Sequence, residues 1–182
     1  MDTRLITIKS ESDMPAAYHG TPVSRLLMYH NLDAGGGAHE KPELLIVMCM
    51  DSRQRMRLPR NFAFFIRNAG ARVEETMFDI SFAIAVGGVE AVAVVGHTDC
   101  RMVGLEASEE KFINGLSERG GWNQEQARLH FSTMCPSLSK RDVVESVRSN
   151  AVLLRSMYPK SVVVPLVYEV GDGLLYLVKE SL

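Results

Sequence analysis

Short apolar runs that lack polar alternation are the feature that most limits the fold of this 182-residue chain. Strands covered on both faces show this pattern, whereas strands with one solvent face alternate. Segments with helical spacing, at about 74–86 and 139–158, separate the runs. This succession of strand-like runs and helical segments predicts an α/β fold with a mainly parallel central sheet flanked by helices. The runs occupy residues 44–48, 62–66, 91–95 and 162–168.

The segment before the first run has weaker periodicity. Residues 1–20 indicate an arm, and Thr21-Pro22 predicts the start of a helix, because proline suits the first helical position. The glycine-rich stretch 33–38 indicates a break. We expect a single domain over residues 1–182, with an N-terminal helical arm over about 1–38 and an α/β core over about 43–182. Residues 174–178 predict an edge strand, and Ser139 predicts the start of the last helix.

Charge and cysteine content exclude several classes of protein. Twenty basic and twenty-two acidic residues leave no basic footprint for nucleic acid. Three cysteines are too few for a disulfide scaffold. The chain shows neither a leader-like apolar stretch after Met1 nor an apolar run long enough to cross a membrane. We therefore expect a cytoplasmic protein, with no membrane or nucleic-acid partner, whose thiols are reduced.

Three metal-binding side chains follow two of the apolar runs. Cys49 comes directly after the first run, and His97 and Cys100 come just after the third. Each has an ordinary structural interpretation alone, since a single cysteine at a strand end is most often a small buried side chain. Carboxyl ends of neighbouring parallel strands meet at one sheet edge, however, so the three can converge. Two thiolates and an imidazole suit Zn²⁺, and three ligands leave a fourth position open, as in catalytic sites.

Two motifs around these residues resemble those of the β-class carbonic anhydrases. Cys49-Met50-Asp51-Ser52-Arg53 fits the first motif of that family, and Gly96-His97-Thr98-Asp99-Cys100 fits the second. Arg67-Asn68-Ala69-Gly70 is similar to a family segment that lies between them. The likeness is close over about residues 43–105 and looser beyond.

The resemblance implies a site and a reaction. Cys49, His97 and Cys100 would bind one Zn²⁺ per chain, and Asp51 and Arg53 would form the catalytic dyad beside it. Zinc-bound hydroxide would hydrate carbon dioxide reversibly to bicarbonate and a proton. The resemblance also implies a homodimer or larger homo-oligomer. In that assembly the N-terminal arm and the 21–32 helix would pack on a neighbouring subunit.

The sequence departs from the family at two places. Arg101 follows Cys100 where the family usually has glycine, which puts fast turnover in question. The segment between Arg53 and Arg67 is short, so part of the pocket wall is missing or comes from a partner subunit. Arginines in this segment either line an anion route or belong to a solvated loop, which we favour. They are Arg55, Arg57 and Arg60.

Three other functions stay open. Cys49 and Arg55 have the Cys-x5-Arg spacing of a cysteine phosphatase or sulfurtransferase, but the loop lacks glycine and Asp51 would repel phosphate. A carbonyl sulfide or carbon disulfide hydrolase would use the same scaffold. The third open function is that of a weakly active or non-catalytic zinc-binding relative of the family. Remaining residues carry weaker signals: Cys135 predicts a structural thiol, Trp122 predicts packing, and no spacing singles out a proton-shuttling histidine among His19, His30, His39 and His130.

Overall fold

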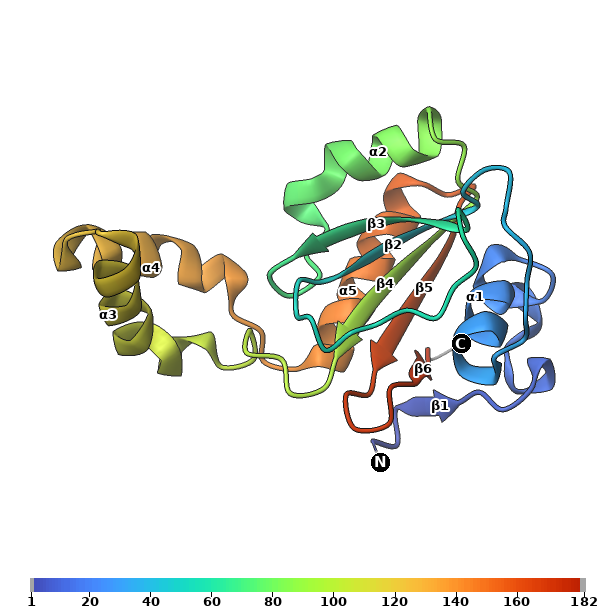
Figure 1. Ribbon diagram of the computed structural model, residues 1–182, viewed down its shortest axis with the longest axis horizontal. Coiled ribbons are helices and arrows are strands. Elements are labelled where there is room, and N and C mark those ends of the chain that lie inside the picture. The colour runs from blue at the N-terminus through green and yellow to red at the C-terminus, as the bar shows by residue number, and fades with distance from the viewer. Residues whose placement is uncertain (1, 181–182) are drawn as a thin grey trace.

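A computed structural model describes residues 2–180, which form a layered α/β fold around a six-stranded sheet (Figure 1). The strand order is β1-β6-β5-β4-β2-β3. Strands β5, β4, β2 and β3 run parallel, whereas β6 and β1 are antiparallel additions at one side. The predicted α/β fold with a mainly parallel sheet is confirmed. The strands are β1 (Leu5–Thr7), β2 (Leu44–Cys49), β3 (Ala63–Asn68), β4 (Ala91–His97), β5 (Val162–Tyr168) and β6 (Leu175–Val178).

Helices cover both faces of the sheet. Helix α1 packs on one face, and α2 and α5 pack on the other. Every residue of β2 and β4 is buried, because each of these inner strands is covered on both sides. The helices are α1 (Pro22–Leu32), α2 (Met77–Ala85), α3 (Glu109–Gly120), α4 (Gln124–Leu138) and α5 (Val143–Met157). Short 3-10 turns occupy Glu11–Asp13, Ala16–Tyr18, Glu74–Thr76 and Leu105–Ser108.

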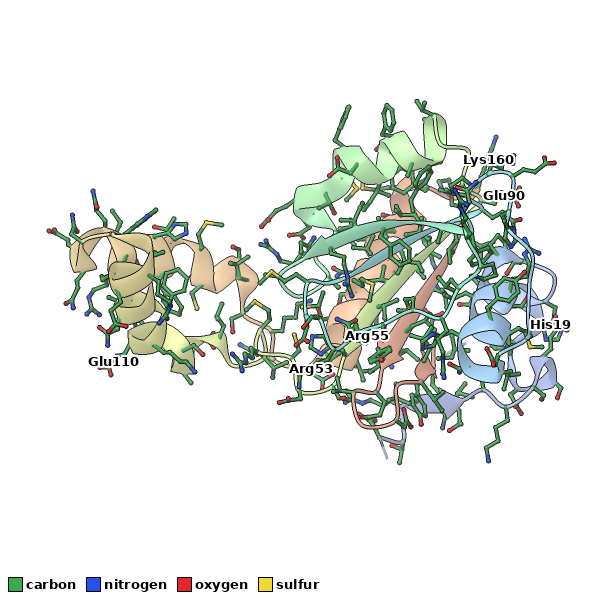
Figure 2. All side chains as sticks on the ribbon, viewed as in Figure 1. His19, Arg53, Arg55, Glu90, Glu110 and Lys160 are labelled. Atoms are coloured by element: carbon green, nitrogen blue, oxygen red, sulfur yellow. The ribbon has the colours of Figure 1, made fainter. Side chains whose placement is uncertain are left out.

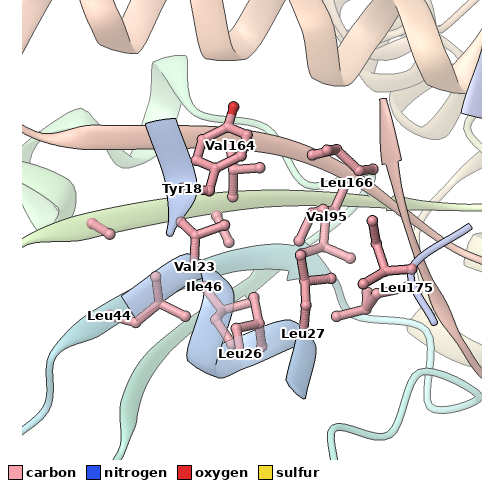
Figure 3. Packing of buried hydrophobic residues seen from close by; sticks show 14 of the residues in the cluster. Tyr18, Val23, Leu26, Leu27, Leu44, Ile46, Val95, Val164, Leu166 and Leu175 are labelled. Carbon is pink, nitrogen blue, oxygen red and sulfur yellow. The ribbon is translucent and has the colours of Figure 1, made fainter. Parts of the chain in front are cut away.

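Helix α1, predicted from Thr21-Pro22, packs on the sheet of its own chain. Thr21 caps the helix by accepting a hydrogen bond from Val23 N at 3.2 Å, and Pro22 occupies the first turn. Val23, Leu26 and Leu27 are fully buried against sheet residues such as Ile46 and Val95 (Figure 3). Burying these apolar side chains stabilises the attachment of α1 to the sheet.

Two other expectations about the ends of elements are wrong. The strand near residue 175 is an inner strand, because Leu5–Thr7 from the supposed arm pairs with it and forms the edge. Helix α5 begins after Asp142, not after Ser139. The Asp142 carboxylate accepts from Glu145 N at 2.9 Å, so it is the side chain that satisfies the first helical N–H groups.

Helices α3 and α4 form a hairpin that stands away from the sheet (Figure 1). Helix α4 runs for 15 residues and tolerates Pro136 in its last turn. The hairpin has a small core of its own, in which Cys135 is buried beside Leu105 and Phe131. The predicted structural role of this thiol agrees with its position.

Candidate metal centre

The structure brings Cys49, His97 and Cys100 together at the carboxyl edge of the sheet. Cys49 is the last residue of β2 and His97 the last of β4, and these strands are parallel neighbours. The two sulfur atoms and the nearest imidazole nitrogen lie within 4.8 Å of one another. All three side chains are nearly or fully buried. Convergence at this edge follows from the strand register, as the sequence predicted.

Local backbone conformation sets the turn between His97 and Cys100. Asp99 has a φ of 55°, a left-handed conformation that aspartate tolerates better than most residues. This turn directs Cys100 back toward Cys49. Gly96 lets α5 approach the end of β4, because a Cβ at this position would lie 2.6 Å from Val143 Cγ1.

Hydrogen bonds leave His97 with a free lone pair. Nδ1 lies 2.9 Å from the carbonyl oxygen of Thr98, and a carbonyl can only accept, so Nδ1 carries the proton. Nε2 then has a lone pair, is buried, and has no hydrogen-bond partner among residues 2–180. A buried, unpaired nitrogen costs free energy unless something binds it. A metal ion would satisfy it, since ligand histidines usually donate their other N–H in this way.

The two thiols also fit a cation between them. The neighbouring Cys100 side chain lowers the pKa of the Cys49 thiol, aided by the backbone N–H of Gly70 at 3.3 Å from Sγ. The same contact raises the pKa of Cys100, because its thiolate would be a second negative charge beside the first. Both thiolates can form together only if positive charge arrives. These donors therefore fit Zn²⁺.

Asp51 and Arg53 form an ion pair beside this cluster. Arg53 donates to Asp51 through Nε and Nη2, and its Nη2 is 2.8 Å from Oδ2. These hydrogen bonds hold the pKa of the Asp51 carboxyl far below its usual range, so it is ionised at neutral pH. Arg53 also binds Asp99 Oδ2 at 2.6 Å, a contact that the sequence motifs did not reveal. The dyad is thus tied to the turn between His97 and Cys100.

Several arginines singled out from the sequence do not reach the cluster. Arg101 is exposed, and its backbone lies outside the left-handed region, so position 101 does not require glycine in this chain. Arg55 is exposed near Arg53 (Figure 2). A cavity of about 10 Å³ lies beside the thiols, and Arg55 is not among the residues that line it. The Cys-x5-Arg spacing therefore does not form a phosphate cradle here.

Two residues near the site were not predicted from the sequence. Gln54 is buried beside the first motif and donates to Cys49 O at 3.3 Å. Lys140 comes from the segment before α5 and lines the thiol-side cavity with Cys49 and Cys100. Neither has a local motif, and Lys140 is distant from the ligands in the sequence. Of the histidines, His30 is fully buried, while His19 and His130 are exposed.

The sequence profile of the carbonic anhydrase family matches residues 44–175, a range that includes the Cys49, His97 and Cys100 cluster and the ion pair between Asp51 and Arg53. The chain belongs to the β-class carbonic anhydrases. A carbonic anhydrase relative in Bacillus subtilis (strain 168), YvdA, named only provisionally as such, is 36% identical over 88 residues. That match covers 43% of this chain and 44% of YvdA, so this chain matches less than half the length of its curated relative.

Solved structures of related enzymes share the fold. The β-carbonic anhydrase isoform I of Trichomonas vaginalis has a TM-score of 0.63 at 17% identity, covering 92% of this chain and 100% of that chain. A carbon disulfide hydrolase has a TM-score of 0.57 at 20% identity, covering 92% and 93%. At these identities the likeness concerns the fold alone. Among the described residues, no helix is long and apolar enough to cross a membrane.

Proposed function

We propose that this carbonic anhydrase hydrates carbon dioxide reversibly to bicarbonate and a proton, with one Zn²⁺ held by Cys49, His97 and Cys100. The observation that carries the proposal is the orphaned Nε2 of His97 beside two buried thiols. Three ligands leave one coordination position open, which is the arrangement of catalytic zinc sites. When bound there, zinc would lower the pKa of a coordinated water to near 7.

Asp51 and Arg53 would orient the attacking water. The ionised Asp51 carboxylate is an acceptor only, so it can fix the direction of one water O–H. Arg53 holds Asp51 in place and neutralises its charge. Because Arg53 is also anchored on Asp99, the carboxylate is restrained from turning toward the thiols. A carboxylate positioned in this way can accept a hydrogen bond without itself filling the open metal position.

The proposal is tested by a stopped-flow carbon dioxide hydration assay on protein of measured zinc content. We expect one zinc per chain, hydration above the buffer rate, and loss of both metal and activity on treatment with a strong chelator. Cys49→Ser and Cys100→Ser should bind less than a tenth of the zinc. Cys135→Ser, which removes the third buried thiol, is the matched control and should keep full zinc. Full zinc in both ligand variants would reject the site.

A carbonyl sulfide or carbon disulfide hydrolase is the second candidate, since a carbon disulfide hydrolase shares the fold. Both substrates are linear molecules like carbon dioxide, and the same site would attack them. Sulfide release from either substrate, at a kcat/KM above that for carbon dioxide, would favour this function. Zinc-loaded protein that acts on none of the three would indicate a non-catalytic zinc-binding relative.

We further propose that the molecule is a homodimer through β3 and α2. Strand β3 is the sheet edge opposite β1, so one row of its backbone N–H and C=O groups has no strand partner within residues 2–180. Large apolar side chains are exposed around it, with exposed fractions between 41% and 79%. A second copy would pair the edge and bury this patch. The side chains are Phe64, Phe65, Phe78, Phe82 and Val86.

Analytical ultracentrifugation of Phe78→Asp tests the dimer. We expect the wild type to sediment as a dimer or a multiple of it and this variant as a monomer, because a charge on the patch would be desolvated. Leu129→Asp, on the hairpin and equally exposed, should leave the assembly unchanged. A wild type that is monomeric at micromolar concentration would reject the interface.

The free state of all three cysteines supports a cytoplasmic location, where thiols stay reduced.

A further inference from the structure

Lys140 joins three segments that meet at the metal centre. Its backbone N donates to Met102 O at 2.7 Å and its carbonyl accepts from Gly104 N at 3.0 Å, which fixes it to the chain just after Cys100. Its side chain reaches the loop after β3, where Nζ donates to Gly70 O, and α5, where Nζ donates to Ser146 Oγ at 2.6 Å. The side chain is half-buried, not free in solvent.

The backbone of Gly70 links Lys140 to the thiol of Cys49. Gly70 N–H donates to Cys49 Sγ at 3.3 Å, while Lys140 binds the carbonyl of the same residue. Gly70 has a φ of +83°, a conformation that glycine adopts without strain. A Cβ at Gly70 would lie 2.9 Å from Lys140 Cε, so the lysine stem packs directly on this glycine. Lys140 therefore holds the Gly70 carbonyl and packs on the glycine, which restrains the residue whose N–H donates to Cys49.

The positive charge of Lys140 interacts with the side chains of Cys49 and Cys100. Among residues 2–180, no carboxylate lies within ion-pair distance of its ammonium, whose hydrogen-bond partners are a carbonyl and a hydroxyl. The side chain lines the same small cavity as Cys49, His97 and Cys100. Burial lowers the pKa of the ammonium, whereas negative charge on Cys100 and Cys49 raises it. A half-buried cation without a carboxylate partner is stabilised by other negative charge nearby.

We propose that Lys140 is a positioning residue of the zinc centre, which orients the Gly70 N–H toward Cys49 and supplies positive charge opposite the two thiolates. This inference rests on the zinc site of the proposed function. Hydrogen bonds and charge beside a thiolate reduce its electron donation to a metal, and they stabilise the thiolate over the thiol. Lys140 would act through Cys49 and Cys100 and would touch neither substrate nor metal.

The test compares Lys140→Met, which keeps the stem but removes the charge and donors, with Lys140→Arg, which keeps the charge. Lys160, exposed at the opposite end of the sheet (Figure 2), provides the control Lys160→Met. Zinc affinity is measured by competition with a chromophoric chelator. The energy of the thiolate-to-metal charge-transfer band is measured on the cobalt(II)-substituted proteins.

We expect Lys140→Met to weaken zinc binding by about 10- to 100-fold, the usual cost of losing a residue that supports a metal ligand. Its cobalt band should shift to lower energy, because the thiolates become better donors. Lys140→Arg should stay within about threefold of wild type, as should Lys160→Met. Equal affinity and an unshifted band in Lys140→Met would overturn the inference, whereas a wild type that binds no zinc would reject the site itself.

A second variant keeps the inference testable if Lys140→Met does not fold. Ser146→Ala removes one hydrogen-bond partner of the ammonium and leaves the charge in the chain. We expect a severalfold loss of zinc affinity and a smaller shift of the cobalt band in the same direction. Unchanged affinity and band in Ser146→Ala would then overturn the inference.

Discussion

At the scale of single residues, the site depends on contacts that cross between loops. The convergence of Cys49, His97 and Cys100 could be predicted, because strand ends of a parallel sheet meet at one edge. The contact between Arg53 and Asp99 and the position of Lys140 could not be predicted, since they depend on how loops fold back over that edge. Local motifs specify donor types at strand ends but not the side chains that reach them from distant segments.

The ion pair between Asp51 and Arg53 leads to a prediction about activity. Asp51→Asn keeps the size of the side chain but removes its charge and one acceptor oxygen. We expect kcat/KM for carbon dioxide hydration to fall by about 10²- to 10⁴-fold with zinc content unchanged, as when a proton-handling group is lost. Stopped-flow assays and metal analysis on the same samples test this. Retained activity with full zinc would remove Asp51 from the catalytic dyad.

For Arg101 we predict that a substitution leaves the activity almost unchanged. Its side chain is exposed and its backbone does not need glycine. Arg101→Gly should therefore change the carbon dioxide hydration rate by less than about twofold. A large gain in rate would mean that Arg101 restrains the site through the open side of the pocket.

At the scale of elements, buried strands and capped helices followed from the sequence more reliably than edges did. The runs of β2 and β4 predicted strands because burial on both faces demands continuous apolar residues. Strand β1 was not predicted, since three half-buried residues carry too short a pattern. Serine and aspartate are both residue types that favour the N-cap of a helix, so the sequence alone did not decide between Ser139 and Asp142. In the structure, Asp142 caps α5.

The packing of α1 on its own sheet predicts a stability effect that is independent of the metal. Leu26 is fully buried, so Leu26→Ala should lower the free energy of unfolding by about 2–5 kcal/mol. Zinc stoichiometry should not change. Leu129→Ala, at an exposed position on α4, should cost less than about 0.5 kcal/mol. Urea unfolding curves compare the two, and an equal small cost for both would show that α1 contributes little to the core.

At the scale of the whole molecule, His30 connects distant segments and makes stability depend on pH. Its Nε2 donates to Gly173 O at 3.0 Å and its Nδ1 accepts from Arg57 N at 3.1 Å, so the neutral ring is required. Burial lowers the pKa of His30 to about 4 from an ordinary value of 6.5. The unfolded chain therefore takes up this proton first as the pH falls.

The contribution of His30 to stability is complete above pH 6.5 and is lost as the pH falls from 6.5 to 4. The full loss corresponds to about 3 kcal/mol in the free energy of unfolding. We expect His30→Gln to be less stable at pH 7.5 but to show a flatter decline over this range. Chemical unfolding at a series of pH values tests this, with His19→Gln as an exposed control. An identical slope in His30→Gln and wild type would contradict the prediction.

The pairing of β1 with β6 has a consequence for how the protein folds. Leu5 pairs with Val178, so residues from nearly opposite ends of the sequence close one side of the sheet. Along the chain, β1 precedes the four parallel strands and its partner β6 follows them. Closing so long a loop costs entropy before its contacts form, so we expect β1 to join the sheet only after the parallel strands have assembled.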